Sequence, residues 1–356
     1  MTIASRDYSL TGTETHLAAE RGLASADWYA HPIPRKQMKD LMRRKDGPAL
    51  RDTAIWLGLM LVCAGFGIHF WGSWLAVPFF IVYGVLYGSA SDSRWHECGH
   101  GTAFKTAWMN DVVYNIACFM IMREPTVWRW SHTRHHTDTI IVGRDPEISV
   151  KRPPDIAGIL LNLFALKSSY FAIRKLALHA SGRLTDEEKT FIPEMEQKKV
   201  YGIARIYLAI LFGVAALSLA LHSWIPAMLI GLPTLYGGYL TVIYGVTQHA
   251  GLSEDVLDHR LNSRTVYMNP ISRFLYWNMN YHVEHHMFPM VPYHALPALH
   301  DVIKDECPEP YPSIVAAYAE IIPALLKQRS DPYYFVRREL PSKTRMTDSV
   351  SLVQTA

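Results

Sequence analysis

Three histidines lie close together between Trp128 and Asp138, at His132, His135 and His136. In an α-helix, residues at positions i, i+3 and i+4 share one face, so these three imidazoles would point the same way. Imidazole nitrogens are ligands for iron, copper, nickel and zinc. The stretch therefore predicts one wall of a metal site.

The chain repeats this arrangement. His282, His285 and His286 have the same spacing, and His96 and His100 form a His-x-x-x-His pair. The three five-residue windows hold eight of the 17 histidines in 356 residues, whereas random placement would put about 0.7 there. A further histidine emerges at the end of a long apolar run, so the candidate metal ligands are His96, His100, His132, His135, His136, His249, His282, His285 and His286.

The segment from His96 to His100, His-Glu-Cys-Gly-His, also matches H-E-x-x-H, the motif of zinc proteases. A catalytic zinc needs three protein ligands and one open position, which would leave most of the clustered histidines unused. Nine histidines suit two metal ions of higher coordination number, and two irons are our preferred interpretation, although imidazole alone does not choose the element. A membrane zinc hydrolase using His96, Glu97 and His100 is the alternative from another class. A metal transporter is a third, and it would place ionisable residues inside its spans.

Two long runs contain no Asp, Glu, Lys or Arg, from Thr53 to Ser91 and from Ile206 to Ser253. Each run is long enough for about two crossings of a ~30 Å hydrocarbon core. Trp, Gly and Pro near the middle of each run suit a short turn at the far membrane surface. We predict two helical hairpins, with four spans near residues 53–71, 74–90, 204–222 and 225–247.

Lys and Arg are frequent before Thr53 and between residues 91 and 205, and absent from both hairpin turns. The positive-inside rule then places both termini and all the histidine clusters in the cytosol. The predicted fold class is an all-α integral membrane protein with a cytosolic helical cap that carries the histidines. The predicted organisation is a cytosolic N-terminal segment with an interfacial basic stretch (1–52), a membrane metal-binding domain (53–300) and a cytosolic C-terminal tail (301–356).

Several other segments carry weaker expectations. Residues 1 to about 30 are polar and predict a flexible or loosely packed tail. Ile156 to Leu178 mixes apolar and basic residues, as in a helix that lies in the membrane interface. The four cysteines form no C-x-x-C pair, and the N-terminus lacks the apolar core of a signal peptide.

The three histidine clusters resemble the three histidine boxes of the membrane fatty acid desaturase family. They are the pair His96/His100 and the triplets that begin at His132 and His282, and they occur in this order around two apolar hairpins. The resemblance covers roughly residues 50–300. It implies a non-haem di-iron site, O2 as oxidant and a mushroom-shaped helical membrane fold, with His249 as an additional ligand. The chain is most similar to small bacterial desaturases and ketolases of this family.

The resemblance implies an oxidoreductase that removes hydrogen from an unactivated C–H pair of a lipid or lipophilic small molecule. A hydroxylase or ketolase on the same scaffold, or a desaturase of a small amino-acid-like metabolite, stays an alternative. The sequence shows no dinucleotide-binding fingerprint and no cysteine set for an iron–sulfur cluster. Electrons would come from a separate carrier such as ferredoxin or rubredoxin with its reductase. The expected location is the bacterial inner membrane, and nucleic acid is not an expected partner.

Polar residues near the histidines have two interpretations. They could hydrogen-bond ligand imidazoles and so orient them, or they could form ordinary helix ion pairs. Among the remaining histidines, His259 alone attracts attention because it precedes the last cluster. The polar candidates are Glu97, Arg134, Asp138, Asp145, Asn280 and Glu284.

Overall fold

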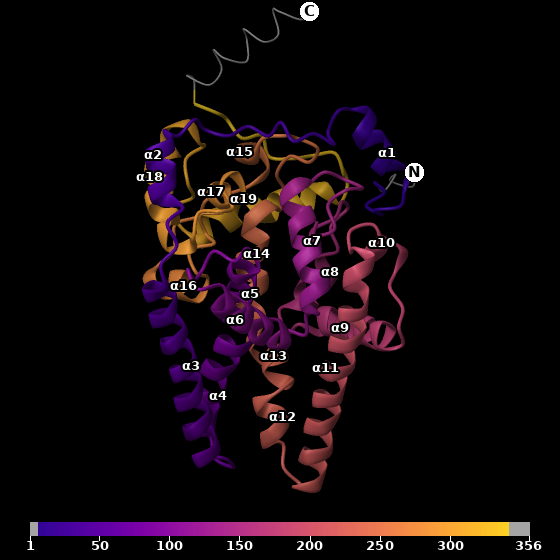
Figure 1. Cartoon of the computed structure of the whole chain (residues 1–356), viewed down its shortest axis with the longest axis vertical. Helices are drawn as coiled ribbons and strands as arrows, with labels where there is room; N and C mark the ends of the chain where they lie inside the picture. The colour runs from indigo at the N-terminus through magenta and orange to yellow at the C-terminus, as the bar shows by residue number, and fades with distance from the viewer. Residues whose placement is uncertain (1–5, 342–356) are drawn as a thin grey trace, which may run out of the picture.

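The computed structural model describes residues 6–341, and within that range every regular element is a helix. Figure 1 shows a lower level of long helices beneath a broad cap of shorter ones. In chain order the helices are α1 (Thr13–Glu20), α2 (Arg35–Leu41), α3 (Asp46–His69), α4 (Ala76–Gly84), η1 (Val85–Ser89), α5 (Ala90–Gly99), α6 (Ala107–Met120), α7 (Pro125–Thr137), α8 (Ile156–Asn162), α9 (Leu166–Ala180), α10 (Asp186–Lys189), α11 (Glu194–Ala220), α12 (Ile225–Leu229), α13 (Leu232–Gly237), α14 (Tyr239–His249), α15 (His259–Asn262), α16 (Pro270–Leu275), α17 (His282–Met287), η2 (Tyr293–Ala295), α18 (Leu296–Ile303), η3 (Lys304–Glu306) and α19 (Ile314–Gln328).

Two helical runs are long and apolar enough to cross a membrane: Arg35–His69, which contains α2 and α3, and α11. Large apolar side chains are exposed along α3 and α11, and Leu61 is 74% and Leu219 is 76% exposed, whereas α2 is charged. Such surfaces are costly in water and are normal for helices that face lipid. The lower level in Figure 1 is therefore the membrane-embedded part of the protein.

The return arms of the two predicted hairpins are not simple helices. After α3 the chain rises through α4, η1 and α5, while after α11 it rises through α12, α13 and α14. The second arm breaks at Gly231, whose φ of 93° few other residues adopt. The four spans that we predicted are thus not confirmed. Apolar composition predicts burial in lipid, but it does not show whether the backbone stays helical throughout.

A bent pair of helices offers a further segment for the membrane. α8 and α9 meet at 82° and would count as a third crossing if they form one broken span. Ala165, between them, has a left-handed backbone with φ 48°. The single interfacial helix that we predicted from Ile156 to Leu178 is therefore two helices with a sharp bend.

The η1 segment is a π-helical turn, and it joins the lipid-facing half of the first return arm to the half that carries histidines. A wider turn leaves backbone carbonyls without their usual partners, so side chains must supply donors. The Trp56 indole donates to the Leu86 carbonyl at 2.8 Å, and the Ser91 hydroxyl donates to the Tyr87 carbonyl at 2.6 Å. These bonds hold η1 in place below α5.

Glycines allow α13 to lie directly against the first return arm. A Cβ atom on Gly237 would lie 1.9 Å from the Gly84 carbonyl carbon and oxygen, so the two backbones touch. The Ser89 hydroxyl donates to the Gly237 carbonyl at 2.5 Å across the same contact. The position of α5 therefore depends on this contact between residues far apart in sequence.

The N-terminal segment packs onto the cap. Tyr8 is buried with Ile140, Val142 and Ile148, and its hydroxyl donates to Glu254 at 2.9 Å. The prediction of a loosely packed tail is therefore wrong for the segment around Tyr8, whereas residues 19–27 are mostly exposed. The remainder of that prediction, residues 1–5, and the last part of the predicted C-terminal tail, residues 342–356, lie outside the described range.

Gly237→Ala tests the backbone contact. The added methyl must push the two arms apart, so we expect a loss of about 1–3 kcal/mol or more in stability, because overpacked sites relax poorly. Thermal unfolding of the detergent-solubilised protein should show a lower Tm. Gly213→Ala in α11, where a Cβ meets nothing within 4 Å, is the control and should keep the Tm. Equal Tm values for the two variants would contradict the contact.

Candidate metal centre

α7 presents its three histidines from a well-capped helix. Glu124 precedes the helix and accepts a hydrogen bond from the Val127 amide at 2.7 Å, and Pro125 fills the first helical position. The helix then runs to Thr137, so His132, His135 and His136 lie along one face. The first expectation from the sequence is confirmed in its geometry.

Three other elements bring the remaining candidates to the same place. His96 lies in α5 and His100 directly follows it, His249 is the last residue of α14, and α17 carries the final triplet. Their donor atoms form two groups that could hold metal ions, each with all ligand atoms within 4.8 Å of one another. The groups are His96, His100, His132, His136 and His285, and His135, His249 and His286.

The first group is a chain of close imidazole contacts. The Nε2 atom of His132 lies 3.0 Å from that of His100 and 3.2 Å from that of His136. The Nε2 atom of His136 also lies 3.1 Å from that of His285. His96 completes the group, with its ring centroid 4.3 Å from that of His132.

His282 lies against the second group. Its Nε2 atom lies 3.0 Å from the Nε2 atoms of both His249 and His286. The rings of His136 and His286, one from each group, have centroids 4.5 Å apart. The two groups are therefore neighbours; they contain eight of the nine predicted histidines, and the ninth contacts two members of the second group.

These contacts cannot all be hydrogen bonds. A neutral imidazole has one N–H donor and one acceptor, so a nitrogen with two close nitrogen neighbours cannot satisfy both. Two nitrogens bound about 2.1 Å from one metal ion, at a right angle, lie about 3.0 Å apart. The observed spacing of 3.0–3.2 Å fits that arrangement. The donor set is thus suited to metal binding, with His-only ligands converging on two points.

Burial keeps most of these imidazoles neutral. Burial, and then the neighbouring imidazoles, lower the pKa of His136, His282 and His285 well below the usual value. The neutral form is the one that offers a lone pair to a metal ion. His135 differs: burial lowers its pKa, but the adjacent Asp145 carboxylate more than offsets this, and the pKa is raised.

Two carboxylates from the loop after α7 orient its histidines. The His135 Nδ1 atom lies 2.8 Å from the Asp145 carboxylate, and the His132 Nδ1 atom lies 2.9 Å from Glu147. Asp145 also accepts from the backbone amides of Ile140 and Glu147, which fixes its position. Such partners hold Nε2 toward the metal side of the ring. The predicted contact of Asp145 is confirmed, whereas Glu147 had not been proposed.

Polar groups orient two histidines of the second set. The Nδ1 atom of His249 lies 2.7 Å from the Asn262 carbonyl, and that of His286 lies 3.3 Å from the Thr139 hydroxyl. Neither partner carries a charge or stands beside a histidine in sequence. No sequence signal that we used could have identified them.

Glu97 and Glu284, the carboxylates closest in sequence to the clusters, do not orient metal-binding imidazoles. Glu97 accepts from the Thr102 hydroxyl at 2.7 Å and from the Tyr293 amide at 3.0 Å. Glu284 lies 2.5 Å from His300, which is outside the clusters. A helix turns about 100° per residue, so immediate neighbours of a ligand face elsewhere. This interpretation of Glu97 and Glu284 was wrong.

The other polar candidates have structural partners. Asp138 pairs with Arg134 and with Arg144, the latter at 2.9 Å. The Asn280 amide donates to the Val266 carbonyl at 2.8 Å. These residues therefore contact other parts of the fold and do not orient the clustered imidazoles.

His259 lies beside the second group without joining it. Its ring stacks on Trp28 at 4.3 Å and lies 5.2 Å from the ring of His286. Burial lowers its pKa to about 3, so the ring is neutral. The N-terminal segment thus covers this side of the centre through Trp28.

A cavity of about 410 Å³ reaches the histidines from the other side. His96, His132, His249 and His282 form part of its wall. It extends along α8 and α14, where Ile159 and Val242 line it. This volume lies in the usual range for small-molecule pockets. A substrate in this cavity would touch the metal-binding groups directly.

Comparison with known proteins agrees with this geometry. Residues 72–318 match the model of the fatty acid desaturase family, and the chain belongs to this family. It is therefore an oxidoreductase, and its apolar helices mark it as a membrane protein. The family uses non-haem iron, and the histidine groups described above could bind metal.

Relatives include desaturases from bacteria and animals. The sn-1 linoleoyl-lipid 6-desaturase of Synechocystis sp. is 24% identical over 278 residues, which cover 67% of this chain and 76% of the relative. The Delta(5) fatty acid desaturase fat-4 of Caenorhabditis elegans is 24% identical over 249 residues, covering 59% of this chain and 53% of the relative. The sn-1 acyl-lipid omega-3 desaturase (ferredoxin) of Nostoc sp. is 31% identical over 96 residues, covering 27% and 25%.

Glu147→Ala should weaken metal binding without unfolding the protein. Loss of a partner that orients a ligand imidazole typically lowers metal affinity by about 10–100-fold. Iron retained against increasing chelator, measured by elemental analysis, gives the affinity. Glu309→Ala removes an exposed carboxylate from the cap and is the control. Unchanged iron retention in the Glu147 variant would contradict the orienting role.

Proposed function

We propose that this protein is an O2-dependent desaturase that acts at a non-haem di-iron centre. The observation that carries the proposal is the convergence of eight histidines into two adjacent groups, with His282 in contact with the second. One group would hold each iron ion. The relatives named as desaturases support the reaction class.

The iron ions would supply the reductive activation of O2, which the side chains of the protein cannot perform. In the balanced reaction, two electrons and two protons come from outside, and two hydrogen atoms leave adjacent carbons of the substrate. One O2 becomes two water molecules, and the C–C bond becomes a double bond. A carrier protein would provide the two electrons.

The protein would contribute orientation and exclusion of water. Asp145 and Glu147 hold two imidazoles in one tautomer, as described above. Trp95 covers the first group, with its ring 5.6 Å from that of His96 and 5.3 Å from that of His132. An apolar cover of this kind would limit side reactions of a strong oxidant with water.

The cavity favours a substrate that combines apolar and polar parts. Asp92 and Arg123 form an ion pair of 3.2 Å in its wall, and the Gln248 amide donates to the Tyr276 hydroxyl at 2.6 Å. We propose a lipid or lipophilic small molecule whose polar group meets this wall. A small amino-acid-like metabolite would fit the same description. Oxygen rebound in place of a second hydrogen abstraction would give a hydroxylase or ketolase.

The surroundings of Glu97 argue against a zinc hydrolase. In such an enzyme this carboxylate would activate a metal-bound water, so it would have to face the metal ligands. It instead contacts Thr102 and Tyr293. Histidines from two further helices, α7 and α17, also converge with His96 and His100. From the Lys and Arg residues before Thr53 and between residues 91 and 205, we also propose that the cap is cytosolic, at the inner membrane of a bacterium.

His135→Ala should abolish O2-dependent turnover while leaving the protein in the membrane. The variant removes a ligand of the second iron without changing the lipid-facing helices. Elemental analysis should give about two irons per chain for the wild type and less for the variant. His16→Ala, at an exposed position, should retain both iron and activity. One zinc per chain and no iron in the wild type would contradict the proposal.

Glu97→Gln separates the two enzyme classes most directly. The amide can still accept from the Thr102 hydroxyl and the Tyr293 amide, so we expect measurable O2-dependent turnover. In a hydrolase the same change removes the general base and nearly all activity. His136→Ala and His286→Ala should lose turnover. If those two variants were fully active and Glu97→Gln inactive, the desaturase assignment would fail.

A further inference from the structure

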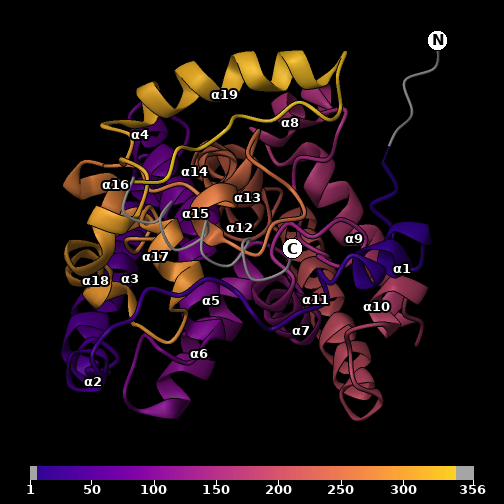
Figure 2. The same ribbon diagram turned by 90° about the horizontal axis from the view of Figure 1, so that it is seen from above.

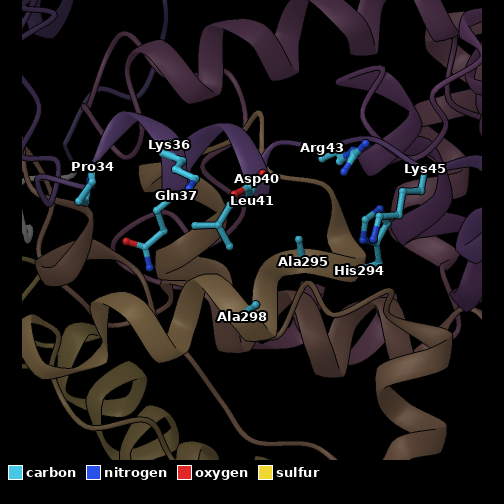
Figure 3. Close-up of a pocket in the computed structure, with 10 residues that line it drawn as sticks. All are labelled: Pro34, Lys36, Gln37, Asp40, Leu41, Arg43, Lys45, His294, Ala295 and Ala298. Atoms are coloured by element: carbon cyan, nitrogen blue, oxygen red, sulfur yellow. The ribbon is translucent and has the colours of Figure 1, made fainter.

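A surface groove separates α2 from the segment η2–α18 (Figure 3). Its volume is about 610 Å³. α2 and the turn after it form one wall, with Lys36, Arg43 and Lys45, and His294 lies on the other side with two alanines. The groove is therefore lined mainly by cationic and small side chains.

The positive charge of this region is not neutralised. Exposed basic residues dominate the stretch from Arg35 to Lys45, and Asp40 is the acidic residue between them. Among the described residues, no carboxylate lies within ion-pair distance of Lys36, Arg43 or Lys45. Unpaired cations grouped around a groove attract an anionic partner and speed its association.

The groove lies on the cap, away from the membrane-embedded level. Figure 1 shows α2 and α18 near the top, well above α16 and the lower halves of α3 and α11, and Figure 2 also shows these two helices next to each other. Ile271 in α16 is 73% exposed, as expected for a helix near the lipid, whereas α2 carries charged residues on its exposed face. This position favours a soluble partner over a membrane surface.

A short bonded route connects the groove with the candidate metal centre. His294 at the groove is adjacent in the chain to Tyr293, whose backbone amide donates to the Glu97 carboxylate at 3.0 Å. Glu97 directly precedes Cys98 and follows His96, a member of the first histidine group. The route from His294 to His96, a proposed iron ligand, therefore consists of covalent bonds and a single hydrogen bond. Trp277 stacks on Tyr293 at 4.4 Å and keeps this segment in place.

We propose that the groove is the docking site for an acidic one-electron carrier protein, and that electrons enter along His294, Tyr293 and Glu97 to His96. The inference rests on the proposed function, because that reaction requires two external electrons. Two reduced carriers would each give up one electron and leave oxidised. Together with two protons and the two hydrogen atoms removed from the substrate, these two electrons would convert one O2 to two water molecules.

Binding can be measured without knowing the substrate. The probe is a cyanobacterial [2Fe–2S] ferredoxin, and the protein is the full iron-loaded chain in nanodiscs of neutral lipid. The combined change Lys36→Glu, Arg43→Glu and Lys45→Glu should weaken binding roughly tenfold or more at low salt, because like charges then oppose the carrier. The control reverses three exposed cations elsewhere, Arg183, Lys327 and Arg329, and should bind as the wild type does.

Cross-linking locates the bound carrier. A carbodiimide joins lysine amines to carboxylates in direct contact, so mass spectrometry should find ferredoxin joined to Lys36 and Lys45. Cross-links confined to other surfaces would overturn the proposal. Protection of these lysines by anionic lipid in nanodiscs, with no ferredoxin cross-link, would assign the groove to the membrane instead and would also overturn it.

The route has its own test. Glu97→Ala removes the acceptor of the Tyr293 amide, so reduced ferredoxin should be oxidised more slowly in anaerobic stopped-flow mixing, with docking affinity unchanged. Glu97→Gln keeps an acceptor and should restore the rate. The iron content of each variant is measured first: a wild-type chain without iron contradicts the proposed function, whereas normal iron with equal rates in all variants contradicts only the route.

Discussion

The structure depends on the convergence of imidazole lone pairs in a site from which water is largely excluded. Nine histidines from α5, α7, α14 and α17 bring their nitrogens within 3.0–3.2 Å at several contacts. A neutral imidazole has one N–H, so these contacts cannot all be hydrogen bonds at once. Metal ions bound between the rings, as proposed above, would compensate the lone pairs that lack a donor. The rest of the fold can be understood as the support that holds these rings together.

That support comes from packing between distant segments. The Gly84–Gly237 contact fixes the first return arm against α13, and side chains stabilise the π-helical turn below α5. On the opposite side, the N-terminal segment packs on the loop that carries Asp145 and Glu147. Each contact restrains one of the elements that present histidines. The same dense support explains why buried polar residues are frequent in the cap.

The groove on the cap gives this rigid centre a connection with solvent. Tyr293 links the groove wall to Glu97, and Glu97 is buried beside His96 but faces away from the histidines. Glu97, whose place in the H-E-x-x-H motif suggested zinc chemistry, thus lies in a position suited to the proposed electron route. Oxidant chemistry and electron entry would take place on opposite sides of α5.

The sequence by itself identified the histidines that cluster and an all-helical membrane protein, because both depend on local periodicity. The i, i+3, i+4 spacing of His132, His135 and His136 places them on one face of any α-helix. Long apolar runs are sufficient by themselves to predict segments within the lipid bilayer. Tertiary structure decided which groups orient the ligands, because Glu147, Asn262 and Thr139 reach their imidazoles from other segments. It also decided where the return arms are interrupted, at the π-helical turn η1 in the first arm and at Gly231 in the second.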